Sequence, residues 1–156
     1  MAAAGYVVSS GTSAIALAAA TAKTIVNVIP SAGRTATVTE LSVSFDGVTA
    51  SAVPVLVELC QSTQATAGTS TAGTLTQVRG RATTVGATAG VNYTVEPTVL
   101  TATRQWLVTP NGGLWTIQFP LGREPEADAT TVKGLALRVT APAIVNVRGY
   151  VEFEQA

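Results

Sequence analysis

The 156-residue sequence predicts an all-β protein, an antiparallel two-sheet β-sandwich that is jelly-roll-like and has about eight or nine strands. Three observations predict it. Apolar and polar side chains alternate with a period of two, turn-forming residues separate these runs at spacings typical of a sandwich, and no segment has a convincing helical pattern. We expect a single domain over residues 13–156, preceded by an N-terminal arm over residues 1–12 that orders only against another surface.

The most informative stretch is residues 40–61. Leu41, Val43 and Phe45 alternate with polar residues, and a second alternating run covers residues 53–59. Asp46-Gly47 ends the first run with turn chemistry, so the two runs are expected to pair as antiparallel neighbours. Because Pro54 cannot donate a ladder hydrogen bond, the second strand should lie at a sheet edge or only begin there.

The other expected strands follow the same reasoning. The Ala-rich segment 13–22 is compatible with a helix, but Ile15 and Leu17 alternate and its neighbours are strands, so we assign it as a strand. The long strand that includes Leu41 should bend near Thr39-Glu40, where the alternation slips by one residue. The remaining expected strands are residues 23–29, 91–95, 104–108, 114–119, 135–140 and 144–154.

Asn111-Gly112 is the strongest turn signal and predicts a tight hairpin between residues 104–108 and 114–119. Trp106 and Trp115 flank this turn. Stacked rings could form a carbohydrate platform, although large aromatic residues near a hairpin are more often core or interface anchors.

Residues 62–90 are rich in Thr, Ala and Gly and predict a long loop with one short strand at Leu75–Arg79. Binding surfaces concentrate on loops, so this segment is the first place to expect partner contacts. The candidate interface residues of the whole chain are Arg79, Arg81, Tyr93, Trp106 and Trp115.

Nine basic and nine acidic side chains give a formal net charge of zero, and charged residues make up only 12% of the chain, about half the usual quarter. Such a surface favours coverage in an assembly, although the codon habit of a GC-rich genome would give the same composition. Without a basic excess, we expect no nucleic-acid or membrane partner. The apolar run 14–20 is too short to span a bilayer and has no basic leader, so we expect no secretion.

The residues needed for common catalytic and metal sites are missing. The chain has no His, which excludes Ser-His-Asp and Cys-His nucleophiles and the usual zinc sites. Cys60 is better explained as a small core or interface residue. Glu124, Glu126 and Asp128 lack the spacing of a calcium loop and predict a solvated acidic loop over residues 123–131. We therefore expect no cofactor, no metal and no enzymatic activity.

Taken together, several segments resemble the small head-decoration (cement) and minor structural proteins of tailed bacteriophages. The resemblance covers most of the chain from Lys23 onward, and the order of the segments carries it. The segments are 41–47 (LSVSFDG), 53–59 (VPVLVEL), 96–98 (EPT), 110–113 (PNGG), 120–124 (PLGRE), 137–142 (LRVTAP), 145–147 (VNV) and 150–154 (YVEFE).

The resemblance implies a protein of the virion, assembled in the host cytoplasm, that binds the outer capsid surface. It would clamp subunits of the major capsid protein, often as a homotrimer at a local symmetry axis. Two alternatives stay open. One is a minor tail or fibre component, and the other is a receptor- or glycan-binding jelly roll that uses Trp106 or Trp115.

Overall fold

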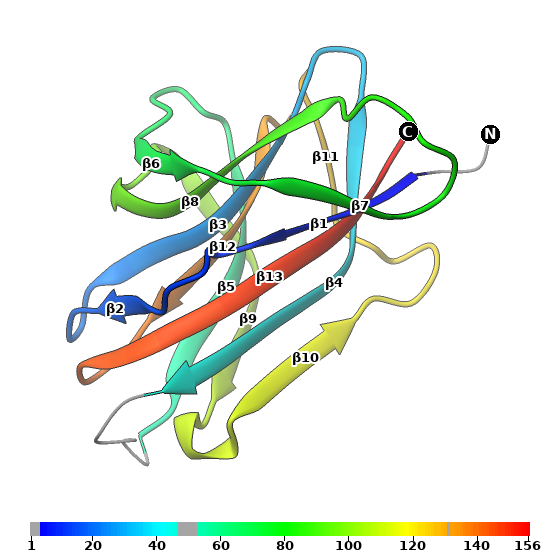
Figure 1. Cartoon of the computed structure of the whole chain (residues 1–156). Coiled ribbons are helices and arrows are strands. Elements are labelled where there is room, and N and C mark those ends of the chain that lie inside the picture. Colours follow the sequence, from blue (N-terminus) through cyan, green and yellow to red (C-terminus); the bar gives the residue numbers. More distant parts are fainter. Residues whose placement is uncertain (1–3, 47–52, 131) are drawn as a thin grey trace.

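The computed structural model describes residues 4–46, 53–130 and 132–156 (Figure 1). These residues form thirteen strands and one short 3-10 helix, η1, at Pro110–Gly112. No helix in these ranges is long and apolar enough to cross a membrane. The strands are β1 (Ala4–Ser9), β2 (Ile15–Leu17), β3 (Ala22–Pro30), β4 (Thr35–Asp46), β5 (Val55–Ser62), β6 (Thr69–Ala72), β7 (Leu75–Arg79), β8 (Ala87–Val95), β9 (Leu100–Val108), β10 (Leu114–Gln118), β11 (Glu126–Asp128), β12 (Gly134–Thr140) and β13 (Val145–Gln155).

The strands form two antiparallel sheets packed as a sandwich. Sheet A has the order β10-β4-β13-β1-β7, with β11 also paired to β4 and β2 also paired to β13. Sheet B has the order β6-β8-β3-β12-β5-β9. The predicted all-β antiparallel sandwich is confirmed, although the strand count exceeds the eight or nine expected.

Eight of the strands pair in the nested order of a jelly roll. The first strand pairs with the last (β1 with β13), and β3 pairs with β12, β4 with β10 and β5 with β9. These pairs fall alternately in sheet A and sheet B. The chain thus resembles one long hairpin rolled into two sheets, which is the double Greek key of this architecture.

Both sheets are widened by strands from residues 62–90, the segment predicted as a long loop. β7 pairs with β1 at the edge of sheet A, while β8 pairs with β3 in sheet B and carries β6 outside it. The predicted short strand at Leu75–Arg79 is confirmed as β7. The predicted strand 91–95 is confirmed as the second part of β8. Pattern analysis missed β6 and the first part of β8, because Thr, Ala and Gly give no hydrophobic alternation.

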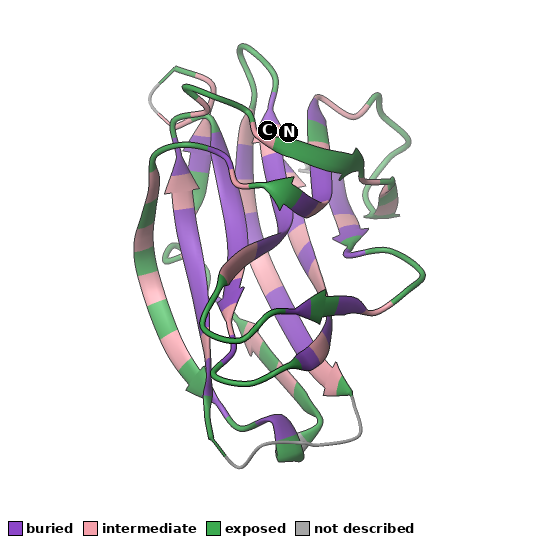
Figure 2. Ribbon diagram, turned by 90° about the vertical axis from the view of Figure 1, so that its left-hand side faces the viewer, coloured by how far each residue is buried: buried purple, intermediate pink, exposed green. Residues whose placement is uncertain are grey.

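The core lies between the two sheets, where burial is almost continuous along the central strands (Figure 2). Gly149 of β13 is required by the closeness of the sheets, because an added Cβ would lie 2.9 Å from Ile25 Cδ1 and from the Ser42 carbonyl oxygen. The largest fully buried side chains are Phe153, Leu17, Ile25, Leu41, Leu59, Leu135 and Leu137.

The predicted pairing of residues 41–46 with residues 53–59 is wrong. β4 lies in sheet A between β10 and β13, whereas β5 lies in sheet B between β12 and β9. The chain therefore changes sheets between Asp46 and Val55; residues 47–52 themselves lie outside the described residues. β5 is not an edge strand, and it begins directly after Pro54, which agrees with the second possibility raised for that proline.

The predicted hairpin around Asn111-Gly112 is also wrong. β9 belongs to sheet B and β10 to sheet A, and the turn region is the single 3-10 turn η1. The positive φ falls on Gly113 (75°). The connection therefore bridges the two sheets, and Trp106 and Trp115 meet across the interior instead of along a ladder.

Two further segments differ from expectation. Residues 4–9, within the predicted N-terminal arm, form β1 and pair with β13 and β7 of the same chain, so they do not need another surface to become ordered. Tyr6 and Val8 supply the buried side chains that hold β1 in place. In the predicted acidic loop 123–131, Glu126–Asp128 pairs with β4 as β11.

Candidate functional site

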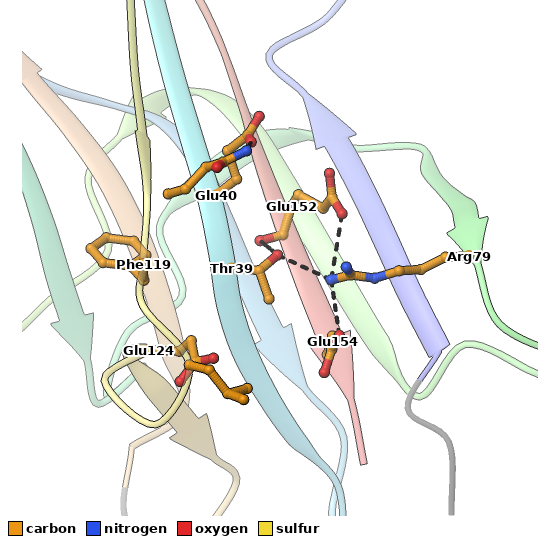
Figure 3. A pocket seen from close by; sticks show the side chains of 9 residues that line it. Thr39, Glu40, Arg79, Phe119, Glu124, Glu152 and Glu154 are labelled. Carbon is orange, nitrogen blue, oxygen red and sulfur yellow. Dashed lines mark hydrogen bonds and ion pairs between the residues drawn. The ribbon is translucent and has the colours of Figure 1, made fainter.

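A shallow groove crosses the outer face of sheet A (Figure 3). Its volume is about 380 Å³. β4 and β13 bring Glu40 and Glu152 side by side in register, and β10 adds Gln118 to the same row. The lining residues are Thr39, Glu40, Arg79, Gln118, Phe119, Leu121, Glu124, Glu152 and Glu154.

Arg79 is the single cation among the described residues that line this groove. One of its terminal nitrogens lies 3.0 Å from a Glu154 carboxylate oxygen and 3.5 Å from a Glu152 carboxylate oxygen, and it donates to Thr39 Oγ1 at 3.3 Å. Four carboxylates and one guanidinium line the groove, so it has an excess of negative charge. This arrangement can attract cationic groups.

Glu40 connects the groove to the centre of the sheet. It accepts a hydrogen bond from Gln118 Nε2 at 2.6 Å and another from the Tyr150 hydroxyl. The hydrogen bond to Glu40, followed by burial, raises the pKa of Tyr150 above its ordinary value. The phenol therefore stays protonated as a donor to the carboxylate.

The five candidate interface residues do not form one site. Arg79 lines the groove, and Arg81 is exposed in the β7–β8 connection, where its carbonyl oxygen accepts a hydrogen bond from Gln77. Tyr93 is 3% exposed and accepts a hydrogen bond from Asn27 at 3.3 Å. Trp106 and Trp115 are half-buried, with ring centroids 5.2 Å apart and planes tilted by 51°. The two indoles pack on each other, so they do not offer the flat exposed platform of a glycan site.

A second polar cluster lies on the outer face of sheet B, where β12, β5 and β9 place Arg138, Glu58 and Gln105 in one row. Arg138 Nε donates to Glu58 Oε2 at 2.8 Å, and Gln105 Nε2 donates to Glu58 Oε1 at 2.7 Å. Burial raises the pKa of Glu58, but the hydrogen bonds from Arg138 and Gln105, with the charge of Arg138, outweigh it and lower the pKa. Both groups stay ionised, and the Glu58 side chain is only 5% exposed.

Cys60 lies in the next row of the same face and is fully buried. Burial raises the pKa of this thiol to about 11, so it is a poor nucleophile at neutral pH. The expectation of a small buried residue agrees with this position. The three acidic residues considered for metal binding have different surroundings: Glu124 lines the groove, Glu126 accepts a hydrogen bond from the Thr37 hydroxyl, and Asp128 accepts one from the Thr130 amide. No group of three or more His, Cys, Asp or Glu suited to a metal is present in the described ranges.

The edge strands are protected against pairing with other chains. β6, β7 and β10 have only four or five residues. β9 is longer, but the register shift opposite Leu59 and Cys60 leaves Thr103 as a bulge. Arg104 also turns inward, 4.5 Å over the Phe119 ring. Bulges and inward-pointing charges are common devices against strand addition, so contacts with partners are better sought on faces and loops.

Comparison with known proteins adds no relative: no family model, curated protein or solved structure matches the chain. Of the groove carboxylates the sequence analysis considered only Glu124, as part of an acidic loop, and it missed the Glu58–Arg138 pair. Glu58, a charged residue inside the otherwise apolar run of β5, was the available signal for the pair. The groove depends on the order of the strands in sheet A, which cannot be read from the alternation of apolar and polar residues.

Proposed function

We propose that the chain is a virion structural protein, a head decoration (cement) protein that binds the outer capsid surface and stabilises contacts between major capsid protein subunits. The sequence resemblance suggests this role, and the jelly roll is compatible with it, since that architecture recurs in capsid and lectin domains. A fold does not determine a function, so support for this role has to come from the properties of the protein surface.

The observation that supports the proposal best is the surface composition. A chain with 12% charged residues also exposes large apolar side chains: Leu121 is 96% exposed, Ile144 75%, Leu107 72% and Leu114 69%. A charge-poor, net-neutral surface that also carries exposed apolar side chains is compatible with coverage by other proteins. In a lattice of many identical copies, modest contacts of this kind add through avidity.

The proposal includes a homotrimer placed at a local symmetry axis, as is common for the family that the sequence resembles. Protected strand edges favour self-contact through faces and loops. Light scattering on the purified chain at micromolar concentration should give three times the 15.8 kDa monomer mass. A clean monomer would remove the trimer from the proposal without removing capsid binding.

The decisive experiment is rebinding of the purified chain to undecorated, expanded capsids. We expect saturable binding with a copy number that is a large multiple of the capsid symmetry, and a higher temperature of capsid disruption. Antibody label found only on tails would indicate a minor tail component instead. Saturable binding on a glycan array that Trp106→Ala abolishes would indicate a glycan-binding module. Either result would overturn the decoration role.

A further inference from the structure

The outer face of sheet B is partly covered by a second layer. β8 pairs with β3 only from Ala87 to Val91; beyond the bend at Asn92 it continues beside β6, where Thr69 pairs with Val95 (Figure 1). We call residues 64–70 and 92–99 the flap. The two halves are joined by the Thr66 amide, which donates to Thr98 Oγ1 at 2.6 Å, and by the Thr98 amide, which donates to the Thr66 carbonyl oxygen at 2.9 Å.

A few polar contacts fasten the flap to sheet B. The Thr24 amide donates to Glu96 Oε1 at 2.8 Å, and the Thr24 hydroxyl donates to Glu96 Oε2. Tyr93 contacts the fully buried Asn27. On the outside the flap exposes Val95 and Val99, each 56% exposed. The two hydrogen bonds to the Glu96 carboxylate are therefore a main attachment of the flap, beside the buried side chains of Tyr93 and Pro97.

Backbone strain concentrates where the flap begins, bends and ends. Four described residues other than glycine have positive φ, and three of them are Gln64 (54°), Asn92 (51°) and Val99 (54°). A β-branched residue such as Val99 is rarely found in this conformation. Strained residues of this kind persist only when surrounding contacts hold them, and they cluster at switches and clamps.

Unsatisfied polar atoms concentrate in the same place. The two buried side-chain polar atoms without a hydrogen-bond partner in the described residues are Asn27 Oδ1 and Asn92 Oδ1. One lies under the flap and the other at its bend. Opening the flap would give water access to both atoms and would release the strained backbone, so closure is stabilised less than its contacts alone suggest.

We propose that the flap is a hinged cover that opens as a unit from sheet B while the rest of the jelly roll stays folded. Opening exposes the row of Cys60 and the Glu58–Arg138 pair, a face with both charge and a free thiol. The inference goes beyond the proposed function and holds whether or not the chain binds a capsid. Regions that open locally in this way are those with few apolar contacts and strained backbone.

Cys60 is a built-in probe of this motion, because it is the one cysteine of the chain. Along β5, the side chain of Cys60 lies between those of Glu58 and Ser62 on the outer face of sheet B. The Ser62 hydroxyl accepts a hydrogen bond from Gln64 of the flap at 2.9 Å. Because Cys60 is fully buried, we expect a disulfide reagent such as DTNB to react with it only after the flap moves. Trp106 and Trp115 lie at the opposite edge of the sandwich, so their fluorescence reports global unfolding.

The test is labelling of Cys60 by DTNB in the full-length folded chain across low guanidinium concentrations. We expect labelling faster than global unfolding, with a shallow denaturant dependence. Glu96→Ala should accelerate labelling at least tenfold, since it removes two charge-assisted hydrogen bonds, and should leave the tryptophan transition nearly unchanged. Glu124→Ala removes a carboxylate from the sheet A groove and should leave the rate unaltered.

Gly90→Ala provides a second variant. An added Cβ on Gly90 would overlap the Tyr93 hydroxyl and Ser70 Oγ, both in the flap, so the substitution should hold the flap open and speed labelling further. The proposal is overturned if Cys60 reacts only at the rate and with the denaturant slope of global unfolding. Immediate labelling of the wild type, or equal acceleration by Glu124→Ala, would overturn it as well.

Discussion

The outer faces of the two sheets use similar side chains with different consequences. On sheet A, Arg79 and its glutamates lie in an open groove, and the arginine side chain is 45% exposed. On sheet B, the Glu58–Arg138 pair lies on a face that the flap partly covers, and the Glu58 side chain is almost completely buried. An ion pair in water contributes little to folding, whereas breaking a buried pair leaves an uncompensated charge. The two faces therefore differ in how far their ion pairs are shielded from water, and not in the types of residue that form them.

The largest expected difference between the faces comes from Arg138→Met. The substitution leaves the Glu58 carboxylate buried without its cation, so the free energy of unfolding should fall by about 3 kcal/mol. Urea denaturation at pH 7 measures it. Arg148→Met is the matched control, because Arg148 and Asp46 form an exposed pair 4.0 Å apart, and it should cost less than about 1 kcal/mol.

Two further measurements sharpen this prediction. The double variant Glu58→Leu with Arg138→Met should regain most of the loss, because no buried charge is left. The pKa of Glu58 is lowered, so its contribution is present above the ordinary carboxyl pKa of 4.5 and is lost as the pH falls through the lowered value. Wild type and Arg138→Met should therefore converge in acid. Equal losses in Arg138→Met and Arg148→Met would contradict the comparison.

A smaller effect is expected in alkali from Cys60. Its pKa is raised from 9.0 to about 11, so the unfolded chain loses this proton first and stability falls as the pH rises from 9 toward 11. Between pH 9 and 10 the loss from this thiol should be about 1 kcal/mol. Cys60→Ala should flatten the alkaline slope by that amount in denaturation experiments at each pH.

The residual slope in Cys60→Ala has its own expected source on sheet A. The raised pKa of Tyr150 acts in the same direction, so Tyr150→Phe should flatten the slope further at higher pH. An unchanged slope in Cys60→Ala would mean that the thiol is ionised equally easily in the folded and unfolded chain.

The smallest effect is expected from Arg79→Ala in the groove. Its ion pairs with Glu152 and Glu154 are solvent-exposed, so the loss of stability should stay below about 1 kcal/mol and shrink as salt is added. Thermal denaturation at low and high salt measures both quantities. A loss as large as that of Arg138→Met would show that the groove, too, is a structural centre.

Particular elements show how far pattern analysis reached. The alternation in residues 41–45 correctly assigned Leu41 and Val43 to the buried face, and the end of the molecule from β12 to β13 follows the predicted strands closely. The same pattern assigned the wrong partner to β4, because a turn-forming stretch between two strands is compatible with a hairpin and with a crossing between sheets. The hairpin predicted around Asn111-Gly112 was wrong for the same reason, because this turn also connects the two sheets.

The candidate site was less accessible to sequence analysis than the fold. Arg79 was singled out, but its glutamate partners come from β13, more than seventy residues away. Only the second half of the flap had a strand signal, in the predicted strand 91–95. Residues 64–70 are mostly small and polar, and the flap is placed by hydrogen bonds, the positive φ of Asn92 and a close approach at Gly90. These are tertiary contacts, which no periodicity encodes.

For this chain, the sequence alone determined the class of structure and, for the strands with clear alternation, the side that faces the core, because alternation with a period of two directly records burial. Only the tertiary structure decided which strands are neighbours, which face is covered and which charges meet. Those features depend on how the chain rolls into two sheets, and that choice is made by contacts between residues far apart in the sequence.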